Sequence, residues 1–212
     1  MVDLFDIRRE YTAGRLDETT AADNPMTQFH AWFEEQKAAQ PDEPTMMTVA
    51  SSDANGQPWQ RILLLKNYDE SGFVFFTNYT SNKARHFEDN PKAALHFAWL
   101  AQERQAMVQG TVSKISREET EAYFHSRPRE SQLGAWASDQ SSPLSNRAEL
   151  EVRFAKLAGE YEGADIPVPD HWGGYRLTPE RFEFWQGGEA RLHDRLEYTR
   201  DGQDWLKQRL NP

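Results

Sequence analysis

Three short apolar segments in the first half of the chain restrict its fold more than any other feature. They are predicted strands at residues 46–50, 59–66 and 73–77. Between them stand Asp53-Ala54-Asn55-Gly56 and Asp69-Glu70-Ser71-Gly72, two sequences typical of hairpin turns. Strands joined by such short turns run antiparallel. The first half of the chain therefore predicts an antiparallel meander.

The remaining segments add helices and further short strands. Helices are predicted after Asn24-Pro25, at residues 81–90, after the capping box at Ser116, at residues 132–137 and around residues 150–161. Strands are predicted at residues 93–99, 105–114, 174–178, 181–185, 192–200 and 205–210. Because strands rarely alternate with helices, the order favours a mainly β antiparallel barrel decorated by α-helices over a doubly wound sheet. We predict one domain over residues 24–212, preceded by a mobile arm over residues 1–23.

Charge and composition exclude several classes of protein. The net charge of −10 disfavours nonspecific binding to nucleic acid or to anionic membranes, so any phosphate site must be a local basic pocket. The absence of cysteine excludes disulfides, thiolate metal sites and cysteine nucleophiles. With no signal pattern and no run of ~18 apolar residues, we expect a cytoplasmic protein.

Several familiar catalytic patterns are missing. The sequence contains no glycine-rich dinucleotide motif and no phosphate-loop signature, and its histidines show no paired spacing for zinc, so we predict no metal site. No carboxylate pair stands out for acid–base chemistry. Hydrolase and metalloenzyme functions therefore have no positive support.

Two basic residues bracket a fully apolar run in the predicted second strand. Arg61 and Lys66 stand on either side of Ile62-Leu63-Leu64-Leu65 and could hold the two ends of a long ligand, but two cationic ends of a buried strand are the commoner meaning of such a pattern. The apolar run predicts burial on both faces. The second face would be covered either by a helix or by another subunit.

Two other segments carry groups suited to anions. Residues 76–83 place hydroxyls and Lys83 at a helix N-terminus, although ordinary capping by Ser81 explains half of that pattern. Tyr123 and Arg127 lie one helical turn apart, with Ser131 shortly after. Taken by itself, this second pattern favours a surface helix end with a solvated arginine over an anion pocket.

Near the C-terminus, the sequence Arg191-Leu192-His193-Asp194-Arg195 concentrates basic side chains. If it is extended, Arg191, His193 and Arg195 share one face, whereas Leu192 and Asp194 point to the other. Guanidinium and imidazole groups on one face suit an anionic ligand. An exposed, charged edge strand is the competing interpretation.

Together, five segments resemble the pyridoxamine 5'-phosphate oxidase family. They are Arg61 to Lys66, Tyr123 to Trp136, Gln140-Ser141-Ser142, Trp172 to Arg176, and Phe184 to Gly188 with Arg191 to Arg195. Any one of these motifs is weak, but five in the same order are specific, and the resemblance runs from Arg8 to the C-terminus.

The resemblance implies an FMN-binding split barrel that forms a homodimer with FMN at the interface. It implies oxidation of pyridoxamine or pyridoxine 5'-phosphate to pyridoxal 5'-phosphate, with O2 as electron acceptor and hydrogen peroxide as by-product. The cofactor performs the redox chemistry, and the protein binds, orients and polarises the reactants.

By matching position, the resemblance also implies roles for individual residues. The residues that would bind FMN are Arg61, Ile62, Leu63, Leu64, Leu65, Lys66, Phe76, Thr77, Asn82, Lys83, Gln105, Gln140, Ser141, Trp185 and Arg195. The residues that would bind substrate are Arg8, Arg9, Glu10, Tyr11, Lys66, Tyr123, Arg127, Ser131, Arg191, Leu192 and His193. Arg191 and His193 would be catalytic, and the segment from Arg8 to Tyr11 would close as a lid.

One departure from the family concerns Asn82, because the family commonly has a basic residue at this position. Loss of one charge-assisted contact to phosphate would weaken FMN binding by about 1.5–3 kcal/mol unless Arg61 and Lys83 compensate. Two alternatives to the oxidase stay open. One is a split-barrel flavin reductase with another substrate, and the other is a carrier that binds flavin or pyridoxal phosphate without turnover.

Overall fold

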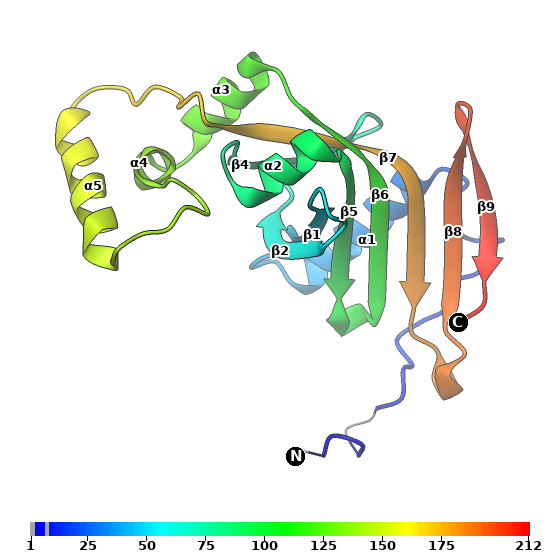
Figure 1. The fold of residues 1–212 in the computed structure, drawn as a ribbon. Coiled ribbons are helices and arrows are strands. Elements are labelled where there is room, and N and C mark those ends of the chain that lie inside the picture. Colours follow the sequence, from blue (N-terminus) through cyan, green and yellow to red (C-terminus); the bar gives the residue numbers. More distant parts are fainter. Residues whose placement is uncertain (1–2, 7–8) are drawn as a thin grey trace. The chain divides into compact units, whose positions relative to one another are not determined.

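A computed structural model describes residues 3–6 and 9–212, and its strands are joined in one sheet (Figure 1). Hydrogen bonding gives the strand order β2-β1-β5-β6-β7-β4-β3. In addition, β8 pairs with β7 on one side and with β9 on the other. The pairs β3/β4, β4/β7, β7/β8 and β8/β9 are antiparallel. The strands are β1 (Met46–Ser52), β2 (Pro58–Leu64), β3 (Asn67–Asp69), β4 (Gly72–Asn78), β5 (Lys92–Trp99), β6 (Arg104–Lys114), β7 (Trp172–Gln186), β8 (Asp194–Asp201) and β9 (Asp204–Leu210).

Helices occur in the predicted places. They are α1 (Pro25–Ala39), α2 (Asn82–Asp89), α3 (Arg117–Ser126), α4 (Arg129–Ala137) and α5 (Arg147–Glu160), with 3-10 turns η1 (Leu100–Gln102) and η2 (Glu189–Arg191). The predicted caps are confirmed: Asn24 accepts from Met26 N, and Ser116 and Glu119 form a capping box. No helix in the described ranges is long and apolar enough to cross a membrane.

The chain divides into two compact units. The first comprises residues 1–49, 94–110 and 179–212, and the second comprises residues 50–93 and 111–178. The aromatic core of the first unit forms where α1 packs on β5 and β7. Phe29 lies 4.9 Å from Phe97, and Trp32 lies 5.3 Å from Phe184, measured between ring centroids. These contacts bury the aromatic face that the helical spacing of α1 predicts.

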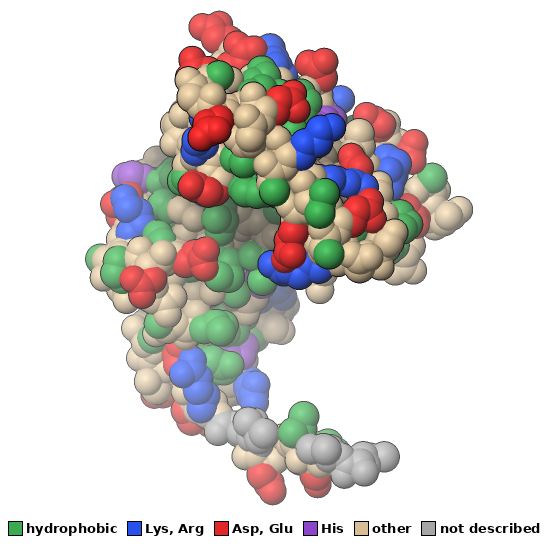
Figure 2. Space-filling model, turned by 90° about the vertical axis from the view of Figure 1, so that its left-hand side faces the viewer, with side chains coloured by type: hydrophobic (Ala, Val, Ile, Leu, Met, Phe, Trp, Pro, Cys, Tyr) green, Lys and Arg blue, Asp and Glu red, His purple; other side chains and the backbone are tan. Residues whose placement is uncertain are grey.

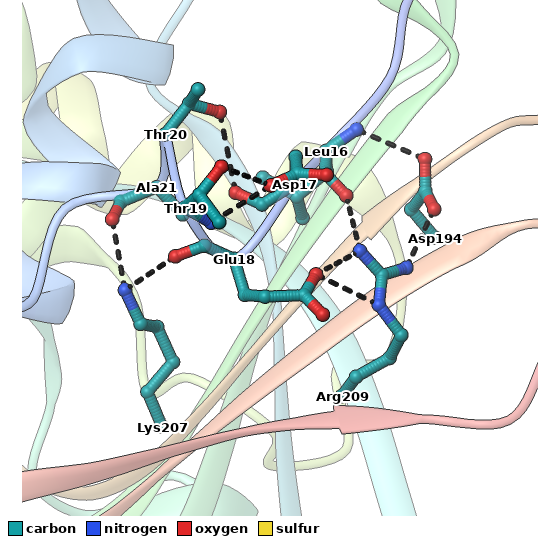
Figure 3. A network of polar contacts seen from close by, with 9 residues as sticks. All are labelled: Leu16, Asp17, Glu18, Thr19, Thr20, Ala21, Asp194, Lys207 and Arg209. Carbon is teal, nitrogen blue, oxygen red and sulfur yellow. Dashed lines mark hydrogen bonds and ion pairs between the residues drawn. The ribbon is translucent and has the colours of Figure 1, made fainter.

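The second half of the N-terminal arm is docked within the first unit (Figure 3). Arg209 of β9 donates to Glu18, to Asp194 Oδ1 at 2.6 Å and to the carbonyl of Leu16. Leu16 N in turn donates to Asp194 Oδ2 at 3.0 Å, and Leu16 is buried. Lys207 adds two bonds to carbonyls of the arm. The mobility of the arm and its action as a lid stay predictions.

In the second unit, a smaller core lies under α3 and α4. It consists of Phe124, Leu133, Ile166, Val168 and Trp172. Phe154, Leu157 and Ala158 of α5, together with its C-cap Tyr161, pack against this cluster. The α4 and α5 helices lie side by side (Figure 1).

The expected burial of residues 62–65 on both faces is wrong for the single chain. Leu65 is 2% exposed, but Ile62 is 62% exposed. The reason is that β2 stands at the end of the strand order and that, within residues 3–6 and 9–212, no helix covers Ile62. Of the two explanations for an apolar run, the covering helix is therefore excluded at Ile62.

Two strand predictions near the C-terminus also need correction. The segments predicted as separate strands around Pro179 form the single strand β7. Its register with β4 ends at Leu177 and its register with β8 begins at Arg181, so Pro179 interrupts neither ladder. The last correction concerns β8, which begins at Asp194 instead of residue 192 because a 3-10 turn precedes it.

Candidate functional site

A cavity of about 720 Å³ opens in the second unit, within the usual size range for small-molecule sites. Figure 2 shows hydrophobic side chains gathered around a hollow on this side of the molecule. The lining residues are Ile62, Leu63, Leu64, Lys66, Phe76, Thr77, Asn78, Tyr123, Arg127, Pro128, Ser131, Gly134, Ala135, Ser138, Gln140 and Trp172. This lining contains two cations and no carboxylate, in a chain with a net charge of −10. The cavity therefore favours an anionic ligand.

Three stacked aromatic rings form one part of the lining. Phe76 lies 3.9 Å from Tyr123 and 5.3 Å from Trp172 between centroids, with nearly parallel planes. Burial raises the pKa of Tyr123, so its hydroxyl keeps its proton and can donate a hydrogen bond. The stack thus gives the cavity a flat apolar wall beside a polar donor.

Arg127 carries the clearest sign of a missing anionic partner. It caps the C-terminus of α3, and its guanidinium lies 4.6 Å from the centroid of Trp172. Its Nη1 atom is buried and has no hydrogen-bond partner among the described residues. Burial lowers the pKa of Arg127, although not enough to remove the charge at neutral pH. A buried charged donor without an acceptor is costly unless a ligand supplies one.

A second buried cation, Lys83, lies at the start of α2. Its Nζ donates to Gln140 Oε1 at 2.6 Å, to Thr77 Oγ1 at 3.0 Å and to Ser81 Oγ at 3.3 Å. All of these acceptors are neutral. Burial, with a smaller contribution from Arg61, lowers the pKa of Lys83 to about 8. An anion at this point would stabilise the ammonium form.

Arg61 is held by a chain of buried polar groups. Its Nη1 donates to Ser51 Oγ at 2.9 Å, and the same oxygen lies 3.0 Å from His86 Nδ1. Burial is the main cause that lowers the pKa of His86, and the nearby charge of Arg61 is the second. A neutral His86 can accept a hydrogen bond from the Ser51 hydroxyl, and the Ser51 oxygen can then accept the hydrogen bond from Arg61. This chain fixes the direction of the guanidinium.

In the first unit, the end of the arm packs against the C-terminal strands. The ring of Tyr11 lies 5.8 Å from Trp185 and 5.6 Å from His193, and the last two rings are 4.7 Å apart. Gly188 N donates to His193 Nδ1 at 3.1 Å, which leaves Nε2 as the second polar atom of the ring. Arg9 lies 5.2 Å from the ring of Tyr11 and pairs with Glu103.

The geometry of residues 191–195 differs from the extended row that alternation predicts. Arg191 ends the η2 turn with φ 64°, and Ala190 has φ 50°. Leu192 is 73% exposed, and Arg195 on β8 pairs with Glu183 at 2.7 Å. Strand alternation therefore begins only at Asp194, and Arg191 lies outside it.

Two family models match most of the chain. The model described as pyridoxamine 5'-phosphate oxidase matches residues 33–160. The model described as the pyridoxine 5'-phosphate oxidase C-terminal dimerisation region matches residues 172–212. The chain belongs to the pyridoxine/pyridoxamine 5'-phosphate oxidase family.

Individual relatives agree with this family assignment. Pyridoxine/pyridoxamine 5'-phosphate oxidase from Shewanella halifaxensis is 48% identical, with all of both chains covered. The protein of that name from Rubrobacter xylanophilus is 52% identical, with 99% of this chain and 97% of the relative covered. The solved structure of PhzG from Burkholderia lata has a TM-score of 0.86 and 29% identity, with 92% and 95% of the chains covered. An FMN-binding protein from Nostoc punctiforme shares the fold at a TM-score of 0.71, with 16% identity over 90% of this chain and all of that chain. The predicted split-barrel fold is confirmed.

For a member of the oxidase family, the structure divides the predicted residues between the two units. In the second unit, the cavity gathers Ile62, Leu63, Leu64, Lys66, Phe76, Thr77, Gln140, Tyr123, Arg127 and Ser131. Lys83 donates to the lining residue Gln140, and Arg61 donates to Ser51. Leu65 is in the core, and Asn82 N donates to Ser141 Oγ at 3.2 Å. In the first unit lie Arg9, Glu10, Tyr11, Gln105, Trp185, Arg191, Leu192, His193 and Arg195. Arg8 lies outside the described residues.

Some of the residues that shape the site were missed by sequence reasoning. Ser51 and His86 orient Arg61, and Trp172 supplies a wall of the cavity and contacts Arg127. Trp172 is the first residue of the Trp172 to Arg176 segment, so the sequence singled out its position but not its role. Ser51 and His86 gave none, because their partnership depends on contacts between segments 35 residues apart.

Proposed function

We propose that this chain is an FMN-dependent oxidase that converts pyridoxamine and pyridoxine 5'-phosphate to pyridoxal 5'-phosphate, with O2 as acceptor and hydrogen peroxide as by-product. The observation that carries the proposal is a cavity whose described lining holds no carboxylate and in which the buried Nη1 of Arg127 has no acceptor among the described residues. The full-length relatives at about 50% identity support the same activity.

The residues present fit FMN. Lys83 and Arg61 are cations held by neutral groups, and Thr77 and Gln140 place oxygens beside Lys83. These groups would hold the phosphate of FMN, and the segment 62–66 with Phe76 would border its ring system. When bound, FMN supplies the redox chemistry by accepting two electrons from the substrate carbon. Gln105, Trp185, Arg195 and Ser141 complete the proposed flavin set.

The substrate phosphate would bind to a second set of donors. Arg127, Tyr123, Ser131 and Lys66 line the same cavity and together offer charged and neutral N–H and O–H donors. Arg191 and His193 would orient the pyridine ring at the reacting carbon, and the segment from Arg8 to Tyr11 would close over it. The packing of Tyr11 on His193 supports this role for the arm.

A homodimer is part of the proposal. Ile62 exposes an apolar side chain at the end of the strand order, next to residues of the cavity lining. The matched C-terminal dimerisation region supports assembly into a pair. A second subunit would cover the apolar face that the single chain leaves open. Cytoplasmic localisation and the single domain over residues 24–212 stay predictions.

The test is to purify the protein, record its flavin absorbance and measure hydrogen peroxide and pyridoxal 5'-phosphate from each substrate. Equal amounts of the two products are expected with pyridoxine 5'-phosphate. A yellow protein that oxidises neither substrate but reduces free flavin would favour a reductase. Tight binding of pyridoxal 5'-phosphate without turnover would favour a carrier, and either result overturns the oxidase.

A further inference from the structure

The first turn of α2 carries positive charge where a helix favours negative charge. The turn contains Lys83 and no acidic residue, and Arg85 stands two positions after Lys83. Cations at a helix N-terminus oppose the helix dipole and the unpaired N–H groups there. The arrangement becomes favourable when an anion binds among these groups.

Arg85 is exposed, yet its side chain turns back toward the start of the helix. Its Nη1 donates to the carbonyl of Thr80 at 2.8 Å, and its Nη2 donates to Asn82 Oδ1. An exposed arginine is otherwise free to extend into solvent, where its charge is well hydrated. These two bonds use two of the five guanidinium N–H groups, so three remain for another acceptor.

Two other cations of the second unit point independently to an anion here. Lys83 is buried, and the hydrogen bonds of its Nζ within the described part of the chain go to neutral oxygens. Arg61 reaches the same helix from β2, because its Nη1 donates to Ser51 Oγ, which lies 3.0 Å from His86 Nδ1 in the last turn of α2. Lys83 and Arg85 near the start of α2 and Arg61 beside His86 therefore bring three cations to this helix, and Lys83 is too deeply buried to be neutralised by bulk water.

We propose that Arg85, positioned by Asn82, supplies a phosphate-binding cation for FMN. The inference rests on the proposed function, because it takes FMN as the ligand at the start of α2. It also revises the expectation for Asn82, since the amide that replaces a basic residue is a hydrogen-bond acceptor for a guanidinium three positions later. Asn82 would act through Arg85 instead of through the phosphate.

The experiment compares the affinity of flavin-free protein for FMN and for riboflavin, which lacks the phosphate, by quenching of flavin fluorescence. Arg85→Gln should weaken FMN binding about tenfold, the effect of losing one charge-assisted hydrogen bond, and leave riboflavin binding unchanged. Asn82→Ala should weaken FMN binding by a smaller factor. The double variant should bind FMN no more weakly than Arg85→Gln, because the two residues act as one unit.

Arg147→Gln is the matched control, since it removes the same charge from another exposed helix position. It should leave both affinities at the wild-type value. Equal losses for FMN and riboflavin in Arg85→Gln, or no loss for FMN, would overturn the role of Arg85 while leaving the oxidase proposal standing. Wild-type protein that binds neither flavin would overturn both.

Discussion

Replacing Arg127 with methionine should separate ligand binding from stability. The guanidinium is costly in the ligand-free protein, because its buried Nη1 has no acceptor among the described residues. Methionine keeps an unbranched apolar side chain over Trp172, which now lies 4.6 Å from the guanidinium carbon. We therefore expect Arg127→Met to lose substrate affinity without losing stability.

The magnitudes follow from the contacts. Removing the unsatisfied donor stabilises the protein by about 1–3 kcal/mol. Loss of the cation–π contact with Trp172 costs about 0.5–2 kcal/mol, and a sulfur–aromatic contact restores about 0.3–1.5 kcal/mol. The free energy of unfolding should thus stay equal or rise by about 1 kcal/mol. Loss of a charge-assisted hydrogen bond should weaken phosphate binding roughly 10- to 100-fold.

The assay has two parts, urea unfolding of the flavin-free protein and steady-state kinetics. KM should rise for pyridoxine 5'-phosphate, whereas the rate with unphosphorylated pyridoxine, which has no phosphate to bind, should not change. The comparison of these two substrates isolates the phosphate contact from any general disturbance of the cavity.

Arg176→Met provides the matched control for stability. Arg176 also belongs to the second unit, but its guanidinium is paired with Asp69 at 3.1 Å and with Glu119 at 2.9 Å. The same substitution there should destabilise the protein by about 1 kcal/mol, since both carboxylates lose a partner. If Arg127→Met destabilises the protein as much as Arg176→Met does, Arg127 is a structural residue and the reasoning is refuted.

Three further perturbations have defined outcomes. In Gly174→Ala, the new Cβ would come within 2.9 Å of the Phe76 ring. We therefore expect the free energy of unfolding, measured in urea, to fall by about 1–3 kcal/mol and flavin binding to weaken. An unchanged affinity for flavin would contradict this expectation. The pKa of Lys83 is about 8 in the folded protein and 10.5 ordinarily, so the unfolded state binds more protons in that window. Stability of the flavin-free protein should therefore rise with pH between these values while FMN affinity falls, and Lys83→Arg should flatten both trends. Arg209→Gln should release the docked arm, because it removes the hydrogen bond to Asp194. Trypsin should then cleave faster after the exposed Arg15, while the unfolding of the core stays unchanged. A cleavage rate equal to that of the wild type would show that other contacts hold the arm.

Local signals explain why most elements were predictable. The caps at Asn24 and Ser116 act within a few residues, and the structure places helix starts at both. The turn at Asp53 closes with a bond from Gly56 N at 2.9 Å, and Gly56 has φ 81°. Each of these features depends on contacts inside one short segment, which is the information that a sequence pattern carries.

The roles of the site residues depend instead on packing between segments that are far apart in the sequence. The anion-binding character of Arg127 follows from its burial against Trp172, 45 positions away along the chain. The local sequence favoured a solvated helix end for Arg127, because it does not carry the packing that decides solvation. Likewise, the sequence could not decide what covers the side chain of Ile62, since both a helix of the same chain and a second subunit would explain an apolar residue there.

The segment before β8 separates two roles of the backbone. Positive φ angles fall on Ala190 and Arg191 and not on Gly187 or Gly188. The glycines are needed for close approach instead: a Cβ at Gly188 would lie 2.4 Å from the carbonyl of Leu192. A positive φ costs a residue with a side chain about 1–3 kcal/mol and persists only where surrounding contacts enforce it. The turn, and not strand alternation, therefore places Arg191, and its positive φ is backbone strain at the residue proposed to be catalytic.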